Sequence, residues 1–203
     1  MDNFRKLEEI FAKFPGIGPR QARRFVYYVL SRPSATVNEL IQLLGEVRKQ
    51  TFECNSCHRL FTTQSHGKNL CNICCDKSRD VKSILIVARD SDFETVEKSR
   101  AYNGMYFVLG GTIPILDKEP EKRIRLEALL HHIKGLKDLK EIILSLNTTP
   151  DGDNTADIVK DALSKVVDSN HTKISVLGRG LSTGAELEYA DSETIKFALK
   201  NRN

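Results

Sequence analysis

The apolar side chains of the first 53 residues recur every three or four positions, which is the spacing of one face of an α-helix. In the first predicted helix these positions are Phe4, Leu7, Phe11 and Phe14. The turn Pro15-Gly16-Ile17-Gly18 ends that helix. Pro19 begins a second helix, because its fixed φ and missing N–H suit the first helical position. The apolar stripe of this second helix consists of Ala22, Phe25, Val26, Val29 and Leu30.

A different pattern fills residues 80–177, where short apolar runs alternate with helix-like stretches. The runs, which predict buried strands, are 84–87, 106–109, 142–144 and 174–177. The stretches between them predict helices at about 92–101, 120–134 and 153–168. Short buried strands that alternate with helices are typical of a mostly parallel sheet covered on both faces. In such sheets, functional residues gather at the carboxyl ends of the strands.

These patterns divide the chain into four segments and predict an α+β protein of several modules. Residues 1–53 form a helical module, and residues 54–75 form a cysteine-rich module that is too short and polar to have a core of its own. Residues 80–177 form the α/β module with the mostly parallel sheet. Residues 178–203 contain a glycine-containing loop followed by a short helix.

The composition is ordinary for a folded protein of 203 residues, with 40% hydrophobic and 29% charged side chains. No apolar run approaches the roughly 18 residues that span a membrane, and the N-terminus lacks the apolar core of a signal peptide. We therefore expect a cytoplasmic protein with no membrane contact. The net charge of +4 is uneven, because residues 1–82 carry 14 basic and 8 acidic side chains. A basic front suggests contact with a polyanion, although a solvated basic face gives the same pattern.

The turn between the two N-terminal helices is suited to binding a phosphate group. Gly16 and Gly18 allow a sharp turn and a close approach of the backbone to a ligand. The N–H groups and the dipole at the start of the next helix attract a phosphate oxygen. The face opposite the apolar stripe carries Arg20, Arg23, Arg24 and Tyr27. This turn with its basic helix resembles the helix-hairpin-helix motif of sequence-independent DNA-binding proteins. The alternative is a plain packing corner with a solvated arginine face.

Five cysteines lie between positions 54 and 75, and four of them form two Cys-x₂-Cys pairs. The four predicted metal ligands are Cys54, Cys57, Cys71 and Cys74. Each pair can present two thiolates to one tetrahedral Zn²⁺, and four thiolates leave no open position for hydrolysis. A redox pair and an iron–sulfur cluster are the alternatives. We interpret Cys75 as a spare thiol, because the Cys-x₂-Cys spacing selects Cys74.

Other polar residues of the cysteine-rich module have weaker assignments. His58 and His66 are expected at the surface, since four cysteines already complete the coordination of a zinc ion. Arg59 and Lys68 are candidates for direct contact with nucleic acid. The module as a whole is expected to brace the junction between the hairpin and the α/β module.

The order of these parts resembles the RecR family of bacterial recombination mediators from end to end. The resemblance rests on the hairpin at 14–19, the four cysteines with the following residues 74–80, and the stretches 102–111, 113–116 and 187–191. It implies that the module at 80–177 is a Toprim domain that begins at about residue 82. It also implies a protein that is not an enzyme.

Toprim domains of topoisomerases and primases hold Mg²⁺ with a glutamate after the first strand and an Asp-x-Asp after a later strand. Asp151 and Asp153 match the second element, but Ala88 and Arg89 stand where acidic residues are expected, with aspartates displaced to positions 90 and 92. A methyl group cannot ligate a metal, and Arg89 would repel Mg²⁺ or pair with one of the two aspartates. A Mg²⁺-dependent phosphoryl-transfer enzyme is therefore disfavoured. Asp151 and Asp153 are a candidate Mg²⁺ or partner site, with helix capping as the alternative.

The resemblance also implies partners and an assembly. RecR-like proteins bind DNA together with RecO and RecF, and they help to load the RecA recombinase on gapped DNA. They form ring-like tetramers through their N-terminal and C-terminal parts. Residues 178–195 are therefore expected to be an assembly segment, with Leu187, Tyr189 and Ile195 as packing residues. The chain is expected in the bacterial cytoplasm, associated with the nucleoid during repair. The remaining alternative is a protein-interaction module that no longer binds DNA.

Overall fold

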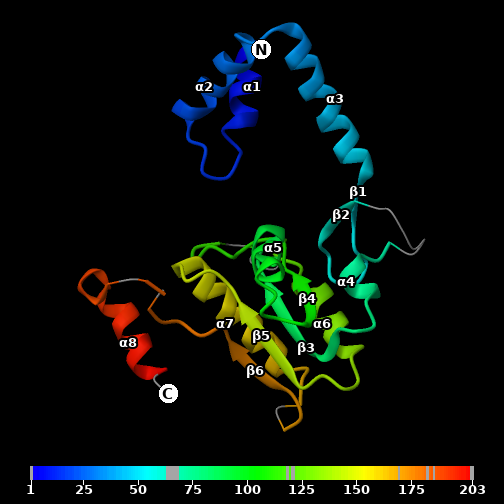
Figure 1. Cartoon of the computed structure of the whole chain (residues 1–203), viewed down its shortest axis with the longest axis vertical. Helices are drawn as coiled ribbons and strands as arrows, with labels where there is room; N and C mark the ends of the chain where they lie inside the picture. The colour runs from blue at the N-terminus through cyan, green and yellow to red at the C-terminus, as the bar shows by residue number, and fades with distance from the viewer. Residues whose placement is uncertain are drawn as a thin grey trace. The chain divides into compact units, whose positions relative to one another are not determined.

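The computed structural model of the chain describes residues 2–62, 69–117, 119, 122–168, 170–181, 183–184 and 186–201. The predictions for His66 and Lys68 lie outside these residues, as do positions 120 and 121 of a predicted helix and Ser182 of the C-terminal loop. The chain divides into two compact units, Met1–Thr51 and Phe52–Asn203 (Figure 1). Within the described ranges, no helix is long and apolar enough to cross a membrane.

The first unit consists of the helices α1 (Asn3–Phe11), α2 (Pro19–Leu30) and α3 (Ser34–Gln50). Asp2 caps α1 by accepting a hydrogen bond from the Phe4 N–H at 3.1 Å. Pro19 is the first residue of α2, as the sequence predicts. The first helix ends at Phe11 and not at Pro15, so Phe14 lies in the turn, where its ring contacts Phe11 edge-on at 5.6 Å.

Helices α1 and α2 pack against each other through a narrow apolar seam. Ala22 and Val26 are fully buried there, and the Phe11 and Phe25 rings lie 5.8 Å apart. The predicted apolar stripe is broader than this seam, because Leu30 is 62% exposed and Phe25 is 42% exposed. Only the middle of the stripe therefore forms the contact between the two helices.

The second unit is built around a four-stranded sheet with the strand order β4-β3-β5-β6, in which every neighbouring pair is parallel. Its strands are β3 (Asp80–Val87), β4 (Gly104–Val108), β5 (Glu141–Ser145) and β6 (Lys173–Val176). Val87 is in register with Val108 on one side and Ser145 on the other, so the carboxyl ends of these strands lie at one edge. The predicted parallel sheet in an α+β protein is thus confirmed.

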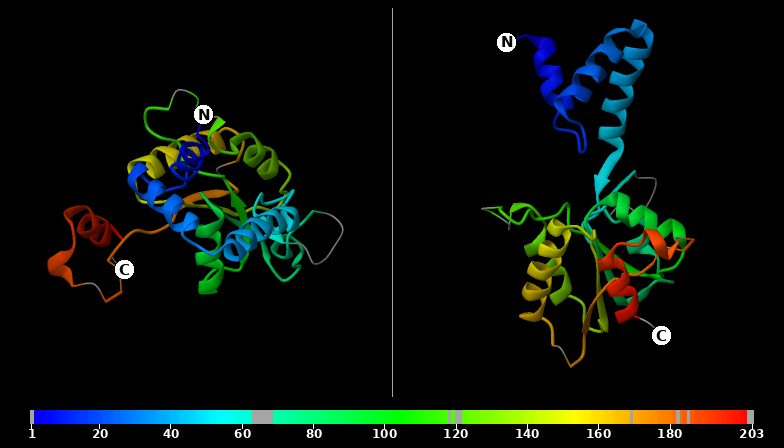
Figure 2. Two further views of the ribbon diagram at one scale, coloured as in Figure 1. Left: turned by 90° about the horizontal axis from the view of Figure 1, so that it is seen from above. Right: turned by 90° about the vertical axis from the view of Figure 1, so that its left-hand side faces the viewer.

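Helices cover both faces of this sheet (Figure 2, left). The helices α6 (Leu126–Lys134) and α7 (Pro150–Ser164) pack on the face that carries Ile84, Ile86 and Phe107. The helix α5 (Asp90–Ser99) packs on the opposite face through Phe93. Burial on both sides explains the continuous apolar runs of β3 and β4. The run at 174–177 differs from the prediction, because β6 lies at the edge of the sheet and Val176 is 49% exposed.

Two of the predicted helices begin at other residues than expected. The helix predicted from 120 begins at Leu126, because Ile124 is buried in the core and the Arg125 N–H donates to the Leu109 carbonyl at 2.8 Å. The helix predicted from 153 begins at Pro150, because Thr149 caps it by accepting a hydrogen bond from the Gly152 N–H at 3.2 Å. Both differences arise from contacts at the carboxyl edge of the sheet.

The cysteine-rich module contains the short strands β1 (Thr51–Glu53) and β2 (Leu60–Thr62), which pair with each other, and the one-turn helix α4 (Asn72–Cys75). Its buried side chains join the second face of the large sheet in one cluster. After β6 the chain forms the short 3-10 helix η2 (Leu187–Tyr189) and the helix α8 (Ser192–Lys200). Asp191 caps α8 by accepting hydrogen bonds from two backbone N–H groups.

Candidate metal centre, phosphate-binding hairpin and carboxylate edge

The structure gathers the four cysteines of the two Cys-x₂-Cys pairs at one point. The sulfurs of Cys54, Cys57, Cys71 and Cys74 all lie within 4.8 Å of one another. The Cys57 and Cys71 sulfurs are 3.6 Å apart. Zinc–sulfur bonds of about 2.3 Å place the sulfurs of a tetrahedral site about 3.8 Å apart. Four thiolates with this spacing therefore fit a closed tetrahedral metal site. Cys75 is not a member of the cluster.

Backbone contacts preorganise the four sulfurs. The Cys71 N–H donates to the Cys54 sulfur at 3.3 Å, and the Cys54 N–H donates to the Arg59 carbonyl at 2.9 Å. Cys54, Cys57 and Cys71 are buried, and Cys74 is half-buried. Hydrogen bonds from the Cys57 and Cys71 side chains lower the pKa of the Cys54 thiol. Hydrogen bonding to Cys54 raises the pKa of the Cys57 and Cys74 thiols. A thiolate is the form that ligates a metal, so binding of a metal ion releases the protons of these two thiols.

The metal centre is attached directly to the Toprim-like sheet. The Val108 N–H, at the end of β4, donates to the Cys57 carbonyl at 2.8 Å. The Leu60 N–H, in β2, donates to the Asp90 carboxylate at 2.7 Å. These two hydrogen bonds fix the C-terminal side of the first cysteine knuckle to the carboxyl edge of the sheet. Asp90 thus holds the cysteine-rich module, a role that sequence reasoning did not assign to it.

Two side chains of this module differ from the sequence prediction. His58 is not a free surface residue, because its ring packs edge-on against Phe107 at 5.2 Å and its Nδ1 lies 2.7 Å from a Glu53 carboxylate oxygen. Arg59 stacks over the Phe93 ring at 4.5 Å and donates to the Asn72 side chain at 2.8 Å. The guanidinium of Arg59 is therefore already engaged within the module, which disfavours a contact with nucleic acid.

The hairpin between α1 and α2 has the backbone geometry that a phosphate-binding turn requires. Gly16 has φ +75°, a conformation that side chains disfavour, and a Cβ built there would have no atom within 4 Å. The Ile17 N–H closes the turn on the Phe14 carbonyl at 3.0 Å. Gly18 is the N-cap of α2, in an extended conformation. The first turn of α2 therefore faces open space, where a ligand can approach its backbone.

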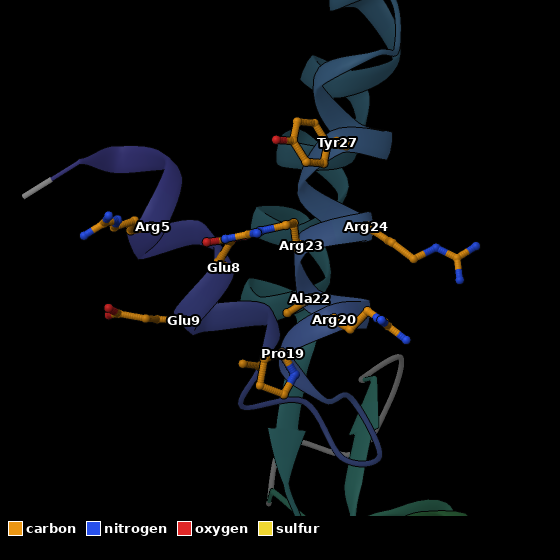
Figure 3. A pocket seen from close by; sticks show the side chains of 10 residues that line it. Arg5, Glu8, Glu9, Pro19, Arg20, Ala22, Arg23, Arg24 and Tyr27 are labelled. Atoms are coloured by element: carbon orange, nitrogen blue, oxygen red, sulfur yellow. The ribbon is translucent and has the colours of Figure 1, made fainter.

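The arginines predicted to share one face are divided between two sides of α2 (Figure 3). Arg23 points toward α1, where its Nε lies 2.6 Å from a Glu8 carboxylate oxygen, and this hydrogen bond raises the pKa of Arg23. Tyr27 also faces α1, with its ring 5.3 Å from the Phe4 ring. Arg20 and Arg24 extend away from α1. Arg20 and Arg24 are therefore the arginines of this surface that point away from Glu8, while Arg23 stays 65% exposed beside Glu8.

The Asp-x-Asp element lies in the first turn of α7, at the carboxyl edge of the sheet. Asp151 accepts a hydrogen bond from the Ile115 N–H at 3.4 Å, and the Asp153 carboxylate forms an ion pair with Arg179. The partner of Asp153 is thus Arg179 and not Arg89. Gly152 between the two aspartates is required, because a Cβ there would lie 1.9 Å from the Asn147 carbonyl oxygen.

The first Toprim element is occupied by residues with structural roles. Ala88 is fully buried after β3, and the Arg89 N–H donates to the Asp92 carboxylate at 2.9 Å. Asp92 therefore caps α5, while Asp90 holds the cysteine-rich module. The helix cap of α7 is Thr149 and not Asp151 or Asp153. Sequence reasoning missed Arg179, although its position just after the last strand places it at this edge.

These features define a Toprim-containing protein with an N-terminal helix-hairpin-helix unit and a four-cysteine cluster. Family models match three parts of the chain: RecR helix-hairpin-helix at residues 4–48, Toprim domain at 82–178 and RecR C-terminal at 180–203. The chain belongs to the RecR family.

Relatives named Recombination protein RecR align with nearly the whole chain. The protein of Lactobacillus acidophilus is 31% identical over 196 residues, which cover 97% of this chain and 94% of the relative. The protein of Phocaeicola vulgatus is 34% identical over 192 residues, covering 95% and 89%. The protein of Streptococcus mutans is 34% identical over 197 residues, covering 97% and 94%.

Proposed function

We propose that this chain is a non-catalytic DNA-binding mediator of recombinational DNA repair. The observation that carries the proposal is the hairpin of the first unit, in a chain that belongs to the RecR family. A glycine with φ +75° opens the turn, and two accessible arginines, Arg20 and Arg24, stand beside the start of α2. A helix start attracts a phosphate oxygen through its N–H groups and its dipole. Contacts to phosphate groups carry no sequence information, so binding through this hairpin is independent of sequence.

In this proposal the four-cysteine cluster holds one structural Zn²⁺. A closed set of four thiolates suits zinc and leaves no position for a reacting water. The ligands are Cys54, Cys57, Cys71 and Cys74. When bound, the ion supplies folding energy to the cysteine-rich module. Two hydrogen bonds, from the Val108 N–H to the Cys57 carbonyl and from the Leu60 N–H to the Asp90 carboxylate, connect the module to the carboxyl edge of the Toprim domain.

The carboxylate edge supports a role without catalysis. A Toprim enzyme needs free carboxylates to hold Mg²⁺. Here a buried methyl group, Ala88, stands after the first strand, and Asp153 is paired with Arg179. The alternative, a Mg²⁺-dependent enzyme, predicts cleavage of labelled DNA with Mg²⁺ or Mn²⁺ that is lost in Asp151→Asn. Such cleavage would contradict the proposal that the chain is not catalytic.

The partners and the assembly belong to the same proposal. The chain acts with RecO, and with RecF, to promote RecA loading on gapped DNA in the bacterial cytoplasm. It forms a ring-like tetramer through its two terminal parts. Exposed apolar side chains at the C-terminal end support this, because Leu187 is 62% exposed and Tyr189 is 79% exposed. Ring formation would place several basic hairpins around one DNA.

The test compares two double variants that each remove two positive charges from the first unit. Arg20→Ala with Arg24→Ala is expected to weaken binding to a gapped duplex at least about tenfold at moderate salt. The slope of log affinity against log salt should also become shallower by roughly 0.9 for each phosphate contact that is lost. The matched control is Arg48→Ala with Lys49→Ala, at the end of α3.

Fluorescence anisotropy of a labelled duplex at several salt concentrations measures both quantities. The control variant should keep nearly the full affinity and the full slope. An equal loss of affinity in the two double variants would show that DNA affinity depends only on the net charge of the first unit. The hairpin would then not be the binding site. Circular dichroism confirms that both variants keep their helices.

A further inference from the structure

Arg179 joins three elements at the carboxyl edge of the Toprim sheet. It lies three positions after the last residue of β6, and its guanidinium forms an ion pair with both carboxylate oxygens of Asp153, with Nη1 lying 3.4 Å from Oδ2. The same guanidinium lies over the Phe197 ring of α8, 5.1 Å from its centroid. The Arg179 carbonyl accepts a hydrogen bond from the Asn201 side chain at 2.8 Å. Arg179 therefore connects α7 to the last turn of α8, through Phe197, and to the C-cap of that helix, Asn201.

This arrangement places a protein cation at a carboxylate that belongs to the Mg²⁺ set in catalytic Toprim domains. The planar guanidinium matches the two oxygens of a carboxylate, and it is always charged. Mg²⁺ requires oxygen ligands in a near-octahedral arrangement and gives up its water reluctantly. With both Asp153 oxygens engaged by Arg179, the residues present do not fit a bound Mg²⁺.

The surroundings explain why a cation is needed here. Thr149, Asp153, Asp191 and Glu193 line the same hollow as Arg179. The Arg179 side chain is only 24% exposed, so its charge acts at short range on these acidic neighbours. Stacking on Phe197 adds a contact that a hydrated metal ion would not make.

We infer that Arg179 is the resident cation of the Toprim carboxylate edge, and that docking of α8 and binding of a divalent cation at Asp153 exclude each other. The inference concerns α8 and Asp153 alone, so it stands or falls independently of DNA binding by the hairpin. It assigns a positioning role to Asp153: the carboxylate holds Arg179, and Arg179 holds the C-terminal helix.

The first experiment measures amide hydrogen exchange of the full, zinc-loaded chain by mass spectrometry. Arg179→Gln and Asp153→Asn should each accelerate exchange in α8 by about fivefold or more, because each removes one partner of a charged hydrogen bond. The double variant should exchange no faster than the faster single variant. Arg89→Gln, an arginine at the same edge, is the matched control and should leave α8 unchanged.

An unchanged α8 in Asp153→Asn would overturn the inference, since Arg179 would then hold the helix without help from the Asp153 carboxylate. Additive effects in the double variant would overturn it as well, because two independent contacts would then act. Both outcomes are judged from the exchange rate of α8 relative to that of α6 in the same molecule. A general loss of stability would accelerate exchange in both helices, and it is thereby distinguished from a specific effect on α8.

The second experiment uses Mn²⁺ alone as a probe, followed by its electron paramagnetic resonance signal. Arg179→Gln should bind Mn²⁺ about tenfold more tightly than the parent chain, because a nearby positive charge and a blocked ligand are both removed. Adding Asp153→Asn should abolish the gain. Equal Mn²⁺ affinity in the parent chain and Arg179→Gln would contradict the inference, because Arg179 would then not compete for the carboxylate.

Discussion

At the scale of single residues, a partly buried hydrogen-bond network surrounds the Glu97 carboxylate in the second unit. Arg79, whose side chain is 9% exposed, donates to Glu97 at 3.0 Å, and the Tyr106 hydroxyl donates to the same carboxylate at 2.9 Å. The hydrogen bond from Arg79 lowers the pKa of Glu97. The network therefore connects the segment after the last cysteine to α5 and to β4.

Replacing Glu97 by Gln is therefore expected to destabilise the second unit by about 2 kcal/mol, since Arg79 is left with only the more distant Asp76 carboxylate, 3.8 Å from its Nε. Glu94→Gln on the same helix is the control. Glu94 pairs with Lys98 at 3.1 Å on an exposed surface, and such pairs contribute about 0.5 kcal/mol or less. Urea unfolding followed by circular dichroism gives both values. Similar losses in the two variants would show that the network adds nothing beyond a surface pair.

A second residue-scale prediction concerns pH. Burial, and then the nearby His58, lower the pKa of His132, whose ring packs on Phe107 at 5.7 Å. The unfolded chain therefore takes up the proton at a higher pH than the folded chain does. The stability contributed by neutral His132 is complete above the ordinary pKa of 6.5 and declines as pH falls through the folded-state value. In His132→Gln, the decline of unfolding free energy below pH 6.5 should be shallower; an equal slope would refute this.

At the scale of elements, the start of α7 decides how the carboxylate edge is built. Thr149 caps the helix, Pro150 is its first residue, and Gly152 lies against the Asn147 carbonyl. This tight turn brings the Asp-Gly-Asp sequence to the end of β5 and aims Asp153 at Arg179. The helix start thus depends on close backbone contact rather than on the aspartates themselves.

Gly152→Ala is expected to destabilise the second unit by about 3 kcal/mol, because the new methyl group would overlap a backbone oxygen that cannot move freely. Gly178→Ala is the control, since a Cβ there meets nothing within 4 Å. Thermal unfolding of the two variants measures the difference. If Gly152→Ala were as stable as the control, the turn before α7 would have to be wider than described here.

At the scale of the whole molecule, the metal centre belongs to the core of the second unit. Its buried cysteines share a cluster with Leu85, Val87 and Phe93, while the first unit ends at Thr51. The sequence pattern predicts a small module between two larger ones. The structure instead extends the Toprim core through that module, so loss of the metal should be felt first on this face of the sheet.

Removal of the metal by a chelator should therefore accelerate hydrogen exchange in β4 and α5, because both elements pack against the cysteines. The amides of α1 and α2 should keep their protection, since they belong to the other compact unit. Hydrogen exchange with mass spectrometry before and after chelation tests this, and added Zn²⁺ should restore the protection. Equal acceleration in both units would show that the metal supports the whole chain instead.

Patterns along the sequence predict the strands, the cysteine cluster and the hairpin, because each of these is determined by neighbouring residues. The contacts that define the carboxylate edge join distant positions, and no local pattern contains them. Asp90 reaches back 30 positions to Leu60, and Arg179 reaches back 26 positions to Asp153. The separation of Arg23 from Arg20 and Arg24 also depends on a contact between distant positions, because Arg23 pairs with Glu8 on another helix.

One hydrogen bond at the metal centre has a consequence for solubility. In the sheet order β4-β3-β5-β6, β4 lies at an edge, and its last amide, that of Val108, is covered by the Cys57 carbonyl. An uncovered strand edge is a template on which other chains add strands and aggregate. The cysteine knuckle therefore covers this end of the β4 edge, and we expect a chain whose knuckle has unfolded to aggregate through β4 more readily.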